Sequence, residues 1–411
     1  MTSAMLITVV LGFALSVSVA VSIGLASIVG IQVTNANMLI SAKEIFNSIN
    51  KFPLAAVPFF ILAGNLMETG GISRRLVEFA KSIVGGVQGG LPMTCVLTCM
   101  IFAAVSGSSV ATTFAIGAIL IPALIKHGYP TSYAAALQAT SAELGVIIPP
   151  SIPMILYGVS AEVSIGELFI AGFGPGILIS GALMLFVWVY CKWKGWGKND
   201  GDGRLGFFKA TRQAAWALLM PVIILGGIYG GIFTPTEASA IAVVYALIVG
   251  MLIYREIGLK DLFPVLRRSV ISSAVIMFII ANAGLFAFLI TRAGVPEAIG
   301  HWLEQVLQSP AMFLLGVNAA LFIIGMFIET SAAIIGIDPV HFGLIMVVNL
   351  ALGMITPPFG VNLFAACTVA RISLDKIIRH LIPFVCVILA CLLIITYVPA
   401  LSLGLRDLVY R

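Results

Sequence analysis

Charged residues are scarce in this sequence. Only 9% of its 411 residues are Asp, Glu, Lys or Arg, whereas 60% are hydrophobic. Soluble domains carry roughly a quarter charged residues, so this composition excludes a soluble globular protein. Apolar runs close to the ~20 residues that cross a bilayer recur along the whole chain. They predict an all-α polytopic membrane protein and not a β-barrel.

Several chemical signatures are also missing. No Gly-x-x-x-x-Gly-Lys-Ser/Thr loop occurs, which argues against a nucleotide-driven pump. The serines at 106–109 lack a nearby histidine base, since His127 and His380 each follow a basic residue at a membrane edge and the other two histidines lie near polar loops. We therefore predict that the protein is not an enzyme. The six cysteines show no paired metal spacing, and the net charge of +5 is spread over loops, so neither a metal cluster nor nucleic acid is indicated.

The sequence of the N-terminal part predicts one long transmembrane span followed by a helix at the membrane surface. Residues 5–31 are too long an apolar run for a signal-peptide core, and we interpret them as one retained span. Residues 36–51 mix polar and apolar side chains, as is typical of an amphipathic helix in the membrane interface. Residues 259–263 resemble residues 42–46, which predicts a second interfacial helix.

A pair of adjacent prolines occurs twice in apolar surroundings. Residues 145–150 and residues 353–358 both read Gly-x-x-x-Pro-Pro. Two prolines remove two backbone donors and clash with the preceding turn, so each helix must break there. Broken backbone at membrane depth is tolerated only where protein buries it or where it lines a cavity, and in transporters such breaks mark binding sites.

The segments around the prolines form two repeats. Residues 89–105 and 110–125 are short apolar arms on either side of a serine cluster, which predicts a re-entrant helical hairpin before the broken helix at 132–158. Residues 313–327, the polar residues 329–331 and the broken helix at 342–364 repeat this plan. An odd number of spans between the units would invert the second relative to the first.

Basic residues predict which segments face the cytoplasm. By the positive-inside rule, loops holding Arg and Lys are cytoplasmic. Four clusters qualify, and they are Arg74–Lys81, Lys192–Arg212, Arg255–Arg268 and Arg371–His380.

Five stretches carry a family resemblance. They are Phe-Pro-Leu-Ala-Ala-Val-Pro-Phe-Phe-Ile-Leu-Ala-Gly (52–64), Ile-Ile-Pro-Pro-Ser-Ile-Pro-Met (147–154), Gly-Ile-Phe-Thr-Pro-Thr-Glu-Ala (231–238), Gly-Ile-Asp-Pro-Val-His-Phe-Gly (336–343) and Ile-Thr-Pro-Pro-Phe-Gly-Val-Asn-Leu-Phe (355–364). In this order they resemble the large membrane subunit of tripartite ATP-independent periplasmic (TRAP) transporters, the DctM family. The resemblance covers essentially the whole chain.

The resemblance implies a sodium-driven elevator-type symporter in a bacterial inner membrane. Its implied partners are a small membrane subunit of Q type, a periplasmic substrate-binding protein of P type and a small organic acid, with membrane lipid around it. On this basis we divide the chain into scaffold (1–85, 164–308), transport segments (86–163, 309–372) and a C-terminal arm and span (373–411). A carrier working without a binding protein, coupled to sodium or protons, and an ion channel remain the alternatives.

Two sodium sites are expected at the helix breaks, because unwound backbone supplies carbonyl oxygens. The first set is Ala103, Ser106, Gly145, Ile148 and Pro149. By symmetry and by the resemblance, the second set is Gly325, Gly353, Thr356 and Phe359. About two or more sodium ions would then be bound. The alternative interpretation is that these glycines and prolines serve only as hinges and packing points.

An anionic substrate is expected between the hairpin tips, where helix N-termini offer free N–H groups. The candidate residues are Ser108, Ser109, Ser151, Thr330, Ser331 and Asn362, each of which also suits a tight helix crossing. Sialic acid, C4-dicarboxylates and keto or sugar acids all fit such a site. Glu143, Glu237 and Glu329 are the acidic residues at apparent membrane depth. Of these, we interpret Glu237 as a helix cap. Glu329 is the better functional candidate, and coupling of transport to protons through Glu329 remains an alternative.

The second hairpin is shorter than the first. Gly128 follows Ser109 by nineteen residues, whereas Gly336 follows Ser331 by five. Either the gate is truncated in this protein, or about fourteen residues of the natural chain are missing from the sequence between 331 and 338, and we favour the second interpretation.

Overall fold

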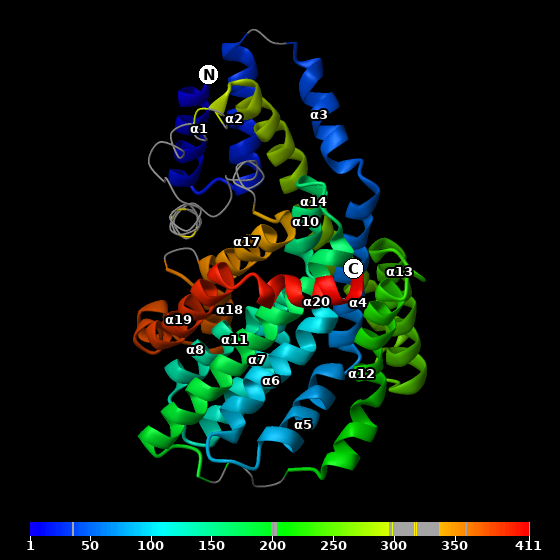
Figure 1. The fold of residues 1–411 in the computed structure, drawn as a ribbon, viewed down its shortest axis with the longest axis vertical. Helices are drawn as coiled ribbons and strands as arrows, with labels where there is room; N and C mark the ends of the chain where they lie inside the picture. Colours follow the sequence, from blue (N-terminus) through cyan, green and yellow to red (C-terminus); the bar gives the residue numbers. More distant parts are fainter. Residues whose placement is uncertain are drawn as a thin grey trace.

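The computed structural model describes residues 1–34, 37–198, 200, 204–295, 298, 316, 318, 337–357 and 360–410. All regular elements within these residues are helices. Figure 1 shows an elongated molecule: α1 and α2 lie at one end with the end of α14, and α5 to α8 and α11 form a bundle toward the other.

The N-terminal segment is a helical hairpin and not one span. Helix α1 (Thr2–Ala14) ends before Ser16, whose φ is +58°, and α2 (Val19–Val33) returns alongside it. A Cβ on Gly12 would lie 2.4 Å from the Ser22 hydroxyl oxygen, so the two helices pack closely. The prediction of a single span over 5–31 is wrong. The turn holds the apolar residues Leu15 and Val17, and hydropathy alone therefore misses it.

The first interfacial helix is confirmed as a helix, α3 (Leu39–Ile49), which packs against α14. The second is wrong as a separate element. Residues 259–263 are the start of α14 (Leu259–Arg292), one helix of 34 residues. The Asp261 carboxylate accepts the Gly258 N–H at 2.8 Å, which caps the helix, and Pro264 is accommodated close to its start.

The long apolar helices agree with a polytopic membrane protein. In the described part of the chain, seven are long and apolar enough to cross a membrane, and a bent pair would make eight. The seven are Phe52–Thr69 (η1 and α4), Ser109–Lys126 (α7), Ile165–Lys194 (α11), Phe207–Tyr229 (α12), Pro235–Ile253 (α13 and η2), Leu259–Arg292 (α14) and Leu374–Tyr397 (α19).

The first hairpin and both broken helices are present. Arms α6 (Gly90–Ser106) and α7 (Ser109–Lys126) pack together. The first broken helix consists of α8 (Thr131–Ala142), α9 (Leu144–Ile147) and α10 (Ile152–Ser160), with a bend of 41°. The second consists of α17 (Pro339–Met354) and α18 (Val361–Ala370). The predicted second hairpin and its shortening after Ser331 lie outside the described residues, apart from Gly316 and Asn318.

Basic segments far apart in sequence meet in space. Arg75 pairs with Glu256 at 2.6 Å and lies 3.8 Å from the centre of the Tyr254 ring. The Gly89 N–H donates to the Gly197 carbonyl at 3.3 Å. Arg74 to Lys81 lie on helix α5 (Ile72–Val84) and not in a loop, and Arg267 and Arg268 lie within α14. The cytoplasmic side of these segments stays a prediction.

The last helix, α20 (Ala400–Tyr410), is tied to the second broken helix. Arg406, only 6% exposed, places its guanidinium 2.7 Å from the Asp338 carboxylate. Asp338 also accepts the Val340 N–H at 2.8 Å and so caps α17. Burial alone would raise the pKa of Asp338, but the hydrogen bonds from Arg406 and Val340 outweigh it and hold that pKa below its ordinary value.

We expect Arg406→Met to destabilise the protein by about 1–3 kcal/mol, because Asp338 would lose a charged hydrogen-bond donor. The measurement is the thermal unfolding midpoint of the purified protein in detergent. The control is Arg212→Met at an exposed position on α12. Equal midpoints for both variants would show that the Arg406 pair contributes nothing to stability.

Candidate ion and substrate site at the helix breaks

The first break leaves backbone carbonyls without their regular partners. The helical donors for the Gly145 and Val146 carbonyls would be residues 149 and 150, both prolines without an N–H. The Ser151 hydroxyl replaces one of them by donating to the Val146 carbonyl at 2.5 Å. Ser151 also caps α10 by accepting the Met154 N–H at 3.4 Å. The Gly145 carbonyl oxygen is thus left without its helical donor.

The tip of the hairpin rests directly on this break. Gly107, with φ at +62°, turns the chain between α6 and α7, and Ser108 caps α7 by accepting the Ala111 N–H at 3.4 Å. The Gly107 carbonyl accepts the Ile152 N–H at 3.4 Å. A Cβ on Gly107 would lie 2.8 Å from the Pro150 carbonyl oxygen, so only glycine fits this close approach.

Oxygen atoms gather where the tip meets the break. The Ser106 hydroxyl lies 3.0 Å from the Thr112 hydroxyl, and the latter donates to the Ser108 carbonyl at 2.8 Å. A Cβ on Gly145 would lie 2.9 Å from both the Ser108 carbonyl oxygen and the Thr112 hydroxyl oxygen. Hydroxyl and carbonyl oxygens are the ligands that hard cations prefer, so this donor set fits a sodium ion.

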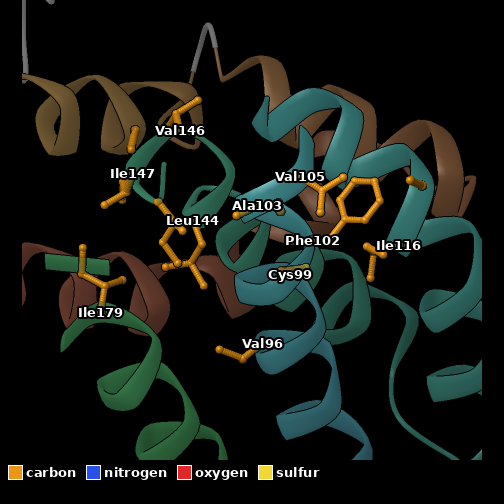
Figure 2. Close-up of a cluster of buried hydrophobic side chains, with 14 of the residues drawn as sticks. Val96, Cys99, Phe102, Ala103, Val105, Ile116, Leu144, Val146, Ile147 and Ile179 are labelled. Atoms are coloured by element: carbon orange, nitrogen blue, oxygen red, sulfur yellow. The ribbon is translucent and has the colours of Figure 1, made fainter. Parts of the chain in front are cut away.

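The remaining members of the first predicted set lie around this cluster. The Ala103 carbonyl accepts the Gly107 N–H at 3.2 Å, and its side chain belongs to the buried cluster with Leu144 in Figure 2. The Ile148 side chain lies against Gly176 of α11. Pro149 is buried in the break itself. The structure therefore brings Ala103, Ser106 and Gly145 together, and whether they bind sodium stays a prediction.

The second break is described only in part. The Thr356 hydroxyl donates to the Leu352 carbonyl at 2.6 Å and keeps lone pairs for a further partner. The Thr356 N–H donates to the Gly353 carbonyl at 3.2 Å. Gly325 and Phe359 lie outside the described residues, so the second set is not assembled here.

The predicted substrate residues have different surroundings. Ser109 is buried, and its hydroxyl lies 3.6 Å from the Met354 sulfur, which joins the first hairpin to the second broken helix. Ser108 lies at the hairpin tip, and Ser151 is fully buried at the first break. Asn362 is also fully buried and donates its side-chain N–H to Glu143. Thr330 and Ser331 lie outside the described residues.

The described acidic candidates differ in their surroundings. Glu237 accepts the Thr234 N–H at 2.8 Å and forms a capping box at the start of α13, which confirms its interpretation as a helix cap. Glu143 is fully buried between α8 and α9. Glu329 lies outside the described residues.

Sequence reasoning missed Thr112 and the pairing of Glu143 with Asn362. Thr112 lies one helical turn after Ser108, so its spacing in Ser-Gly-Ser-Ser-Val-Ala-Thr was a usable signal. The Glu143–Asn362 contact joins residues 219 positions apart, and no local pattern announces it.

A known protein family matches nearly the whole chain. The model of the family described as the tripartite ATP-independent periplasmic transporter, DctM component, aligns with residues 6–401. The chain belongs to the DctM family. It is therefore a membrane transport protein and not an enzyme, and the helices with seven apolar spans in the described residues agree with this.

Relatives within the DctM family carry several substrate names. The C4-dicarboxylate TRAP transporter large permease protein DctM of Pseudomonas aeruginosa is 43% identical, with 89% of each chain covered. The isethionate TRAP transporter permease protein DctMQ of Oleidesulfovibrio alaskensis is 42% identical, covering 94% of this chain and 63% of that protein. The sialic acid TRAP transporter large permease protein SiaM of Vibrio cholerae is 34% identical, covering 90% of this chain and 89% of that one.

One solved structure shows a similar fold. The YdaH transporter of Alcanivorax borkumensis superimposes with a TM-score of 0.61 at 13% identity, covering 87% of this chain and 86% of that chain. At this identity the likeness concerns the fold alone.

The two motif glycines are expected to respond differently to the same substitution. Gly145→Ala would push a methyl group into the Ser108 carbonyl and Thr112, whereas within the described residues nothing lies within 4 Å of a Cβ on Gly353. We expect Gly145→Ala to cost about 1–3 kcal/mol of stability and Gly353→Ala to cost less than half of that. Thermal unfolding in detergent measures both, and an equal loss would contradict the asymmetry.

Proposed function

We propose that this chain carries a small organic acid anion across the bacterial inner membrane in symport with sodium. The observation that supports this most is the hairpin tip on the double-proline break, where Ser106, Ser108 and Thr112 present oxygens beside Gly145. Such a meeting of broken helix and hairpin is typical of ion sites in secondary transporters.

Two or more sodium ions are proposed per transport cycle. The first would be held by backbone carbonyls around Ala103, Gly145, Ile148 and Pro149 with the hydroxyls of Ser106 and Thr112. The second would use Gly325, Gly353, Thr356 and Phe359. A bound sodium ion supplies positive charge next to the substrate anion, and the protein supplies neutral oxygens that hold the ion without a buried carboxylate.

The proposed substrate class follows from the N-termini at the breaks. Helices α7, α10 and α18 begin at Ser109, Ile152 and Val361, and their first N–H groups favour an anionic group. Relatives are named for C4-dicarboxylates, isethionate and sialic acid, which are all organic anions. We propose Ser108, Ser109, Ser151, Thr330, Ser331 and Asn362 as the residues around the acid.

The proposed partners are a small membrane subunit and a periplasmic binding protein. Membership of a tripartite family supports both, and the relative called DctMQ, of which this chain covers 63%, supports a close association with a Q-type subunit. In the proposed elevator motion, the segments 86–163 and 309–372 would move against the rest of the chain.

Uptake is expected to require sodium, and to increase with membrane potential where the sodium ions that move inward outnumber the negative charges of the acid. Each net positive charge that moves inward gains about 2.3 kcal/mol per 100 mV. The assay is uptake of a C4-dicarboxylate into proteoliposomes that hold this chain with its small subunit and binding protein. Saturable flux that is lost in choline supports the sodium-coupled carrier. Flux that persists in choline contradicts sodium coupling, and flux that does not saturate favours a channel.

Uptake is also expected to depend on both partners. Proteoliposomes with the complete set should take up substrate, and omission of either the small subunit or the binding protein should abolish uptake. The control is a binding protein with a different ligand specificity. Full uptake by this chain alone would support the alternative carrier that works without a binding protein.

A further inference from the structure

Gln138 is a buried polar residue between the first broken helix and the first hairpin. It lies on α8, about two helical turns before Gly145, and its side chain is 0% exposed. Helix α8 packs against both arms of the hairpin, α6 and α7. A buried amide is costly unless its donors and its acceptor find partners, so the contacts of Gln138 indicate what it does there.

The Gln138 amide contacts both arms of the hairpin. On α6, the Cys95 thiol donates to Oε1 of Gln138 at 3.1 Å, and Nε2 donates to the Cys99 sulfur at 3.6 Å. On α7, the carbonyl of Thr112 accepts Nε2 of Gln138 at 3.4 Å. An amide has both donors and an acceptor, so this single side chain can join α8 to two helices at once.

Helix α7 leaves room for the side chain of Gln138 to lie along it. A Cβ on Gly117 would lie 3.1 Å from Cγ of Gln138, which is closer than an ordinary carbon contact. Because Gly117 has no side chain, the aliphatic part of Gln138 fits against α7 and its amide reaches the Thr112 carbonyl.

Thr112 connects this amide to the oxygen cluster at the hairpin tip. Its carbonyl accepts from Gln138, whereas its hydroxyl donates to the Ser108 carbonyl at 2.8 Å and lies 3.0 Å from the Ser106 hydroxyl. A restraint on the Thr112 carbonyl therefore also restrains its hydroxyl beside Gly145. We propose that Gln138 is a positioning residue, which fastens the first hairpin to the broken helix and thereby holds the oxygens of the cation site in place.

The second repeat contains a similar connection. Asn349 lies on α17, four residues before Gly353, and is 1% exposed. Its Nδ2 donates to Oδ1 of Asn318 at 2.6 Å, and Asn318 belongs to the segment 313–327 that the sequence predicts as the first arm of the second hairpin. Asn318 in turn donates to the Thr396 hydroxyl at 2.9 Å. A buried amide on the first half of the broken helix thus contacts a hairpin segment in both repeats.

A purely structural role for Gln138 makes different predictions from a positioning role. If its hydrogen bonds only stabilised the fold, their loss would lower the unfolding midpoint, and the hairpin tip would stay closed in the folded protein. If Gln138 fastens the hairpin, their loss opens the tip locally while the rest of the chain stays folded. Local opening is measured by the exchange of backbone amide hydrogens.

Hydrogen–deuterium exchange of the purified protein in choline chloride tests the fastening without sodium. Gln138→Met keeps an unbranched side chain and removes the amide. Residues 105–112 should exchange about fivefold faster than in wild type, which corresponds to the loss of one net hydrogen bond. The control is Asn282→Leu, which removes a buried amide on α14 beside Gly24 of α2 and should leave the tip unchanged. A tip that exchanges at the wild-type rate in Gln138→Met would overturn the proposal.

A second variant keeps the test valid if Gln138→Met does not fold. Cys95→Ala removes the donor to Oε1 and leaves the hydrogen bond to Thr112, so it releases α6 from Gln138 and keeps α7 attached. Because a thiol is a weak donor, exchange at residues 103–107 should rise by only about twofold. Exchange that does not change in Cys95→Ala would contradict a connection to both arms.

The sodium dependence of uptake tests the link to the cation site, and this part rests on the proposed sodium symport. In proteoliposomes with both partners, Gln138→Met should raise the sodium concentration for half-maximal uptake about fivefold, with a maximal rate close to wild type. Asn282→Leu should change neither value. A looser tip with an unchanged half-maximal concentration would overturn the positioning role. If wild-type uptake needs no sodium, the proposed symport fails, and the exchange measured in choline still decides whether Gln138 fastens the hairpin.

Discussion

The structure depends on what two adjacent prolines do to a helix in apolar surroundings. They remove the donors for two carbonyls at once, and an apolar environment offers no water in exchange. Those carbonyls must find partners within the protein. At the first break the Ser151 hydroxyl satisfies one of them, and the hairpin tip at Gly107 and Ser108 packs against the rest. The helix break therefore determines where the hairpin lies.

The same constraint explains why polar side chains concentrate at this level of the molecule. The pairs Ser106–Thr112 and Glu143–Asn362 are both buried, and both lie beside a broken segment. They differ in what they do. The first presents neutral oxygens around the Gly145 carbonyl, which suits a sodium ion. The second joins the two broken helices through a hydrogen bond between side chains.

Much of this arrangement could be predicted from the sequence, because its signals are local. The double prolines and the serine turn of the first hairpin each act within a few residues, and the structure confirms the first hairpin and the helix ends before both double prolines. The turn at Ser16 escaped prediction because Leu15 and Val17 hide it within an apolar run. The Glu143–Asn362 contact and the approach of Thr112 to Gly145 escaped because they depend on tertiary packing between distant segments. The second sodium set lies partly outside the described residues, so Gly325 and Phe359 stay predictions.

The central claim is that the hairpin tip and the first helix break together form a cation site. Electron cryo-microscopy of the complete transporter, prepared once in sodium chloride and once in choline chloride, tests it most directly. The account predicts a density peak that appears only in the sodium chloride sample. This peak should be enclosed by the Ser106 and Thr112 hydroxyls and the carbonyls of Ser108 and Gly145. Maps that show these four oxygens in the same positions with no density between them in either salt would contradict it.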